Sequence, residues 1–189
     1  MGLKTDNLKK ILNEGINVFE FKEVSSFEEL IEYVKKNNKF TIRFDRDNNI
    51  HGLPFYKYDD DLNLNKIYEE ALNKNCTLLL SNGYKYDDDL LFNFVIEIDD
   101  DNNFILELCD KKIPLRDMYS NTTTIIKGNL FSDAYEYINR DSNKYTKKDI
   151  KNIIDFVVKK NIKYHYLEGT LYSMEVGVLY KNIIIWQTD

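Results

Sequence analysis

An arginine inside a strand-like segment is the side chain whose position most clearly suggests a chemistry. In residues 39–45, KFTIRFD, apolar and polar residues alternate, so Arg43 is expected on the face opposite the apolar side chains. A lone arginine inside a strand points toward a chemistry rather than merely a fold. The alternative is a surface ion pair of Arg43 with Asp45 or Asp47, which would stabilise the fold little.

Aspartates gather in three short runs, at residues 59–61, 87–89 and 99–101. One interpretation is that they are solvated loops and hairpin tips. The other is an acidic surface that binds a basic protein partner, with nearby tyrosines adding contact area around a polar tip. The residues assigned to that partner surface are Asp59, Asp60, Asp61, Tyr84, Tyr86, Asp87, Asp88 and Asp89.

Other chemistries have little support in the residue types. His51 and His165 are the only histidines, so any mechanism that uses an imidazole depends on one of them. Cys76 and Cys109 are the only cysteines and their spacing fits neither a zinc site nor a disulfide framework. The sequence also lacks a Walker loop, a GxGxxG motif, an HExxH motif and a nucleophile elbow.

Composition narrows the class of protein further. The 189 residues, 43% of them hydrophobic, suit a single domain over residues 1–189, or one domain with two small lobes. A net charge of −6 disfavours direct nucleic-acid binding, which depends on clustered lysine and arginine. No apolar run of about 18 residues predicts a membrane span. A cytoplasmic location is therefore expected, with no membrane association.

Periodicity and capping signals predict the elements that position these residues. Ser25 or Ser26 is expected to cap a helix that has acidic residues in its first turn and lysines in its last. The other predicted helices are residues 3–13, 64–73 and 146–160, with a short one at 131–138. The predicted strands are residues 18–21, 39–45, 77–80, 163–168, 170–178 and 183–187, and residues 114–117 are predicted to form a loop.

The clearest supersecondary signal is a β-hairpin. Two apolar runs, residues 90–98 and 103–108, flank the turn sequence DDDNN. Hairpins in the second half follow a strand–helix–strand order in the first half. The predicted fold class is therefore α+β, with mostly antiparallel sheets and about four helices.

The segment from Gly15 to Arg46, GINVFEFKEVSSFEELIEYVKKNNKFTIRFDR, resembles the opening of an ATP-grasp domain. That family shows a helix, a "GI.VP.F" strand, an "S.EEL" helix and a strand that ends in a basic residue. The end of the chain is similar as well, because a helix at 146–160 and a last strand, IIIWQTD, resemble the family's closing helix and its "E-x-N" strand. The resemblance covers nearly the whole chain and implies a two-lobed fold with ATP and magnesium as cofactors.

The resemblance also implies roles for individual residues. Arg43 would lie over the nucleotide phosphates, Gly52 in the loop that covers them, and Leu79–Ser81 in the strand whose backbone reads adenine. Ser81 is thus a candidate cofactor-binding residue together with Arg43 and Gly52.

The implied metal ligands lie near the end of the chain. Glu168 would match the first magnesium ligand, while Gln187 and Asp189 would match the two ends of the "E-x-N" strand. Glutamine replaces a carboxylate there, and the phosphate loop, DRDNNIHG, has a single glycine among acidic residues. These departures imply a catalytically degenerate module, which either binds a nucleotide or has become a scaffold.

Two functions therefore remain open. The first is a nucleotide-binding or catalytically degenerate ATP-grasp-like module. The second is a non-enzymatic acidic interaction protein, such as an inhibitor or immunity-type protein of a mobile element, which binds a basic protein surface.

Overall fold

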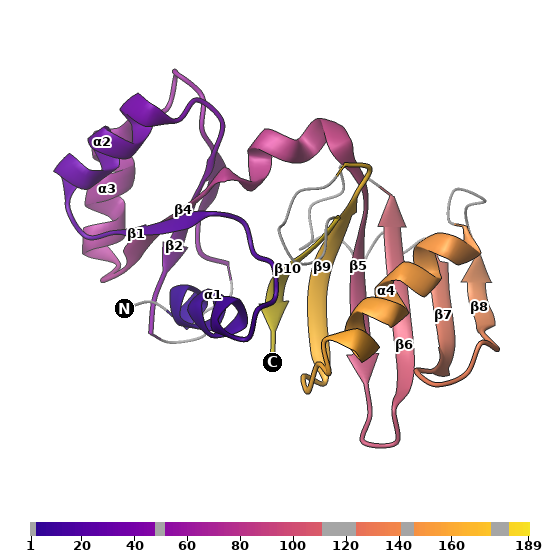
Figure 1. Cartoon of the computed structure of the whole chain (residues 1–189). Helices are drawn as coiled ribbons and strands as arrows, with labels where there is room; N and C mark the ends of the chain where they lie inside the picture. The colour runs from indigo at the N-terminus through magenta and orange to yellow at the C-terminus, as the bar shows by residue number, and fades with distance from the viewer. Residues whose placement is uncertain (1–2, 48–51, 111–123, 141–145, 175–181) are drawn as a thin grey trace. The chain divides into compact units, whose positions relative to one another are not determined.

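A computed structural model describes residues 3–47, 52–110, 124–140, 146–174 and 182–189. The chain forms two compact units (Figure 1). The first unit comprises Met1–Asn13 and Phe19–Asp88, and the second comprises Glu14–Val18 and Asp89–Asp189.

The first unit contains a four-stranded antiparallel sheet in the order β1-β4-β2-β3. β1 and β2 both pair antiparallel with β4, so they run parallel to each other with α2 between them in the chain. This split β-α-β arrangement agrees with the predicted strand–helix–strand order. Its elements are α1 (Leu3–Asn13), β1 (Phe21–Val24), α2 (Phe27–Lys36), β2 (Thr41–Asp45), β3 (Phe55–Lys57), α3 (Leu64–Asn73), β4 (Thr77–Ser81) and the 3₁₀ helix η1 (Asn82–Asp89).

The helices α2 and α3 cover one face of this sheet (Figure 1). The shared core joins apolar residues of both helices to alternate residues of the strands, including Leu30, Ile42, Phe44, Ile67, Leu78 and Leu80. The intervening strand residues therefore lie on the opposite face. This alternation is the one predicted for residues 39–45.

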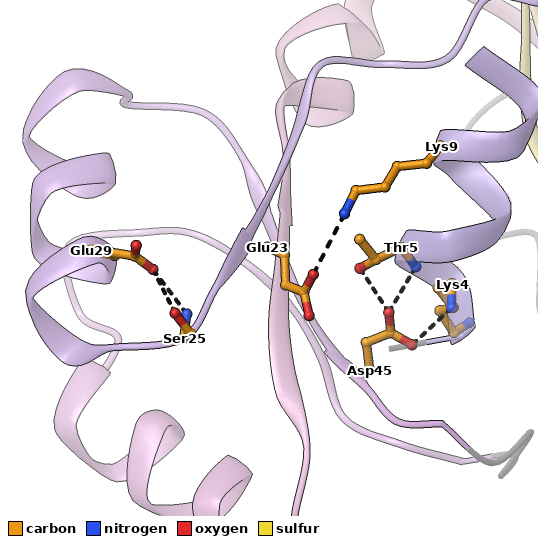
Figure 2. A network of polar contacts seen from close by, with 7 residues as sticks. All are labelled: Lys4, Thr5, Lys9, Glu23, Ser25, Glu29 and Asp45. Carbon is orange, nitrogen blue, oxygen red and sulfur yellow. Dashed lines mark hydrogen bonds and ion pairs between the residues drawn. The ribbon is translucent and has the colours of Figure 1, made fainter. Parts of the chain in front are cut away.

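The start of α2 shows how the sequence sets an element boundary. Ser26 is the N-cap, and its Oγ accepts a hydrogen bond from Glu29 N at 3.2 Å. The Glu29 carboxylate in turn accepts from Ser25 N at 2.9 Å (Figure 2). That backbone hydrogen bond lowers the pKa of Glu29. The predicted cap is confirmed, at Ser26 rather than Ser25.

The second unit contains a six-stranded antiparallel sheet in the order β10-β9-β5-β6-β7-β8. The predicted hairpin is confirmed as β5 and β6, and Asp99 in its turn accepts hydrogen bonds from Asp101 N and Asn103 N. α4 lies against one face of the sheet (Figure 1) and buries its apolar side. The elements are β5 (Leu90–Ile98), β6 (Asn103–Asp110), β7 (Thr124–Asn129), β8 (Glu136–Arg140), α4 (Lys147–Lys159), β9 (Tyr166–Tyr172) and β10 (Ile183–Thr188). Among the described helices, none has the length and apolarity that crossing a bilayer requires.

Three predicted elements differ from the structure. The helix predicted at residues 131–138 is wrong, because this stretch forms a turn followed by strand β8. The first short strand begins at Phe21 rather than at residue 18. β9 continues through Gly169, where a break between two strands was expected. The loop predicted at 114–117 and the end of the strand predicted at 170–178 lie outside the described residues.

Gly169 allows the sheet to pack closely. A Cβ added there would lie 2.6 Å from Phe94 Cζ and 2.9 Å from the carbonyl oxygen of Ile184. We expect Gly169→Ala to lower the free energy of unfolding by about 2 kcal/mol, because the Phe94 ring and a paired strand must both shift. Urea unfolding measures the change, with Gln187→Ala at an exposed strand position as the control. Equal stability of Gly169→Ala and the wild type would contradict this packing argument.

Candidate functional site

Arg43 and Ser81, two of the residues that the ATP-grasp resemblance connected with a nucleotide, lie on the sheet face of the first unit opposite α2 and α3. Strand register places one row across this face as Lys57, Thr41, Ser81 and Phe21. The next row is Phe55, Arg43, Leu79 and Glu23. Arg43 and Ser81 therefore occupy neighbouring strands on the same face.

Part of this face is covered by α1 (Figure 2). The carboxylate of Asp45 accepts hydrogen bonds from Lys4 N at 2.9 Å and Thr5 N at 2.8 Å, and Lys9 Nζ lies 3.9 Å from Glu23 Oε2. Leu79 is accordingly 2% exposed. Arg43 and Phe55 are half-buried and Lys57 is exposed, so the β3 side of the face stays open.

Two cations lie over two aromatic rings on this open side. The guanidinium carbon of Arg43 lies 4.9 Å from the centre of the Phe55 ring. Lys57 Nζ lies 4.6 Å from the centre of the Tyr84 ring. Such contacts hold a cation in place without neutralising it. We call Arg43, Phe55, Lys57 and Tyr84 the cationic face.

Lys57 was not among the candidate site residues predicted from the sequence. The signal was present, because alternation in β3 puts Phe55 and Lys57 on the same side. The three-residue length of that strand made the signal weak.

Ser81 ends β4 and is 6% exposed. Its Oγ accepts a hydrogen bond from Gly83 N at 3.4 Å, and its carbonyl oxygen accepts from Thr41 Oγ1 at 3.3 Å. β4 has β1 on one side and β2 on the other, so its backbone groups are used within the sheet. A nucleotide base that hydrogen-bonds to backbone groups would therefore contact the chain beyond Ser81, where η1 begins.

Gly52 is exposed and has a φ of +80°, a backbone conformation that residues other than glycine rarely adopt. No atom lies within 4 Å of a Cβ added at this position. The preceding residues 48–51 lie outside the described residues, so the role of Gly52 in a phosphate-covering loop stays a prediction.

Several residues of the hypothetical acidic partner surface have contacts within the chain. Lys57 Nζ lies 2.7 Å from Asp87 Oδ2, and Tyr86 stacks on Phe19 with ring centres 5.7 Å apart. Tyr84 and Tyr86 belong to η1 rather than to a loop. Asp59, Asp60, Asp61 and Asp88 are exposed, whereas Asp87 and Asp89 are half-buried. Partner binding by this surface stays a prediction.

The predicted metal ligands lie in the second unit. Glu168 in β9 pairs directly with Gln187 in β10, and its carboxylate accepts a hydrogen bond from the Tyr166 hydroxyl. The carboxylate of Asp189 accepts from His165 N and Tyr166 N, each at 3.3 Å.

These ligands fit a magnesium ion only in part. Carboxylate oxygen is the ligand type that magnesium prefers. Both carboxylates, however, already accept hydrogen bonds from the chain. Within the described ranges, no group of three or more His, Cys, Asp or Glu side chains is arranged to hold a metal ion. The described donor set is incomplete for magnesium.

The second unit also contains a pocket of about 880 Å³ at the turn end of β5 and β6. Its ionisable lining residues are Glu97, Asp99, Lys127, Glu136 and His165. Carboxylates outnumber lysines there, so the pocket suits a cation better than a phosphate. The cationic face of the first unit is the better surface for an anion.

Comparison with solved structures connects this arrangement with known folds. The chain matches a carboxyaminoimidazole ribonucleotide synthase from Aspergillus clavatus, solved with ATP, at 12% identity and a TM-score of 0.56 over 98% of this chain and 43% of that one. An N5-carboxyaminoimidazole synthetase from Staphylococcus aureus, solved with ADP, matches at 8% identity and a TM-score of 0.54 over 96% and 42%. The macrocyclase MdnC from Microcystis aeruginosa MRC, bound with the precursor peptide MdnA, matches at 8% identity and a TM-score of 0.52. This match covers 98% of this chain and 51% of that one.

No protein-family model matches the sequence, and no curated protein matches it. The chain spans about half the length of the solved proteins that it matches. At such low identities the likeness concerns the fold alone. The resemblance predicted from the segment Gly15 to Arg46 is confirmed at that level: nearly the whole chain has the fold of about half of a RiPP-associated ATP-grasp ligase from Chryseobacterium gregarium, at 10% identity and a TM-score of 0.52 over 98% of this chain and 51% of that one.

Proposed function

We propose that this chain is a nucleotide-binding, ATP-grasp-like module whose cationic face takes the phosphates of the nucleotide. One observation carries the proposal: Arg43 lies in β2, a middle strand of the first sheet, on the face opposite α2 and α3. The fold supports it, because two of the similar structures were solved with ATP or ADP.

The geometry around Arg43 suits an anion. The Phe55 ring lies beneath the guanidinium, whose carbon is 4.9 Å from the ring centre, on the open side of the sheet. A guanidinium can donate two parallel hydrogen bonds to phosphate oxygens, and partial burial strengthens them relative to water. Arg43 would thus orient the phosphate chain across β2 and β3.

We propose binding with degenerate catalysis, since Gln187 supplies an amide beside Glu168 where a second carboxylate would be the stronger magnesium ligand. Magnesium, when bound, would neutralise phosphate charge. Its coordination by Glu168 and Asp189 remains a prediction.

Calorimetric titration of the purified chain with ATP tests the proposal. We expect a dissociation constant in the micromolar range, a binding free energy of about −8 kcal/mol. The titration is run once with magnesium and once with EDTA. Absence of binding in both would refute the function, while equal binding in both would refute only the metal assignment.

The exposure of Asp59, Asp60, Asp61 and Asp88 favours the second candidate function, binding of a basic protein partner. Opposing charged surfaces are screened within about 10 Å at 0.1 M salt. Such a complex should therefore form at low salt and dissociate as salt rises, which pull-down at graded salt concentrations measures. A complex that is insensitive to salt would contradict this function.

A further inference from the structure

We propose that Lys57 is a second phosphate-binding cation of the cationic face and that Asp87 competes with the nucleotide for it. The inference rests on the proposed function and extends it to the control of affinity at the same site.

Strand register places Lys57 within reach of the ligand of Arg43. Arg43 pairs with Phe55, and Thr41 pairs with Lys57, so Arg43 and Lys57 are diagonal neighbours on one face. Diagonal neighbours in an antiparallel pair lie roughly 7–8 Å apart. A polyphosphate chain can contact both cations at that separation, since both side chains are long.

Lys57 now has a carboxylate partner. Its Nζ lies 2.7 Å from Asp87 Oδ2, and the side chains are 53% and 38% exposed. Ion pairs this exposed contribute little to stability, so breaking the pair costs little. A polyphosphate carries several negative charges against one on Asp87, and it would displace the carboxylate from Lys57.

Tyr84 keeps Lys57 in position during that exchange. The ammonium lies over the Tyr84 ring at 4.6 Å, a contact that does not depend on Asp87. Asp87 and Tyr84 both belong to η1, so one short helix carries the ring that holds Lys57 and the carboxylate that competes for it. Asp87 therefore lowers affinity while contributing little to the stability of the site.

The test is a double-mutant cycle measured by titration with ATP. We expect Lys57→Met to weaken binding about 10-fold, through loss of a charged hydrogen bond. Asp87→Asn should tighten binding about 2- to 5-fold, because an exposed ion pair contributes little. In the Lys57→Met background, Asp87→Asn should have no effect. Glu70→Gln, at the ion pair with Lys74 on α3, is the matched control.

Two results would overturn the inference. One is unchanged or weaker binding by Asp87→Asn. The other is a gain that persists when Lys57 is methionine, because the carboxylate would then act by general repulsion rather than through Lys57. Thermal unfolding of each variant shows that the fold is intact.

Inorganic tripolyphosphate as a second probe distinguishes this inference from the proposed function. Tripolyphosphate binding that responds to Lys57 and Asp87, without ATP binding, would refute the nucleotide function and support only the part of the inference that makes Lys57 a phosphate-binding cation controlled by Asp87. ATP binding that neither Lys57→Met nor Asp87→Asn changes would support the nucleotide function and refute the inference. No binding of either probe would overturn both.

Discussion

Replacement of Arg43 by alanine is expected to weaken ATP binding at least about 30-fold while the protein stays folded. Loss of a hydrogen bond to a charged group costs about 2 kcal/mol or more, which corresponds to this factor. The guanidinium lies over the Phe55 ring on the open side of the sheet and contributes little to the core that α2 and α3 form. Calorimetric titration measures the affinity, and urea unfolding measures the stability.

The control for Arg43→Ala is Lys36→Met, which removes one positive charge from the first unit at the end of α2. It separates a local effect from a change in net charge. If Arg43→Ala and Lys36→Met bind ATP with the same affinity, Arg43 is not part of the site. Arg43→Lys should give an intermediate affinity, because an ammonium keeps the charge but loses the paired hydrogen bonds.

Local patterns were sufficient to predict on which side of its strand Arg43 lies. Alternation in residues 39–45 identified the side of the sheet on which the arginine lies, and turn residues located the hairpin of β5 and β6. Both signals arise from residues close together in the chain. The insertion of β4 between β1 and β2 has no such signal, because pairing between distant strands is set by the packing of the whole sheet.

The contacts of Lys57 were missed for the same reason. Its partner Asp87 is thirty residues away in the sequence, and the aspartate run was interpreted as a loop although it belongs to η1. Only the fold of the first unit brings these residues together.

The incorrect helix at residues 131–138 has a different cause. Phe131, Ala134, Tyr135 and Ile138 repeat at intervals of three and four, as on an amphipathic helix. The structure leaves Phe131 73% exposed and pairs β8 with β7. The hydrogen bonds that this segment makes with β7 stabilise a strand more than its helical spacing of apolar residues stabilises a helix.

Asp45 is expected to be the most important single polar side chain for the stability of the first unit. It is 1% exposed, yet its carboxylate accepts four hydrogen bonds. They come from Lys4 N, Thr5 N, Thr5 Oγ1 and Arg46 N, at 2.8 to 3.0 Å. A carboxylate on β2 thus caps the start of α1, about forty residues away in the sequence, where negative charge also favours the helix dipole.

Asp45→Ala should therefore lower the free energy of unfolding by about 3 kcal/mol. The change leaves buried N–H groups at the start of α1 without an acceptor, and each such loss costs about 1–3 kcal/mol. Asp45→Asn keeps one acceptor oxygen and should lose less. Urea unfolding measures both variants, and hydrogen exchange at Lys4 and Thr5 should accelerate even before global unfolding, because α1 loses its anchor.

Asp149→Ala provides the matched comparison. Asp149 accepts hydrogen bonds from Thr146 in the capping box at the start of α4, a local and more exposed arrangement. Its loss should cost about 1 kcal/mol, the usual cost of a helix cap. A cost for Asp45→Ala no larger than that would contradict the anchoring role. If α1 does detach, the face around Leu79 becomes exposed beside Arg43. Nucleotide affinity of Asp45→Asn would then show whether the edge of the cationic face depends on α1.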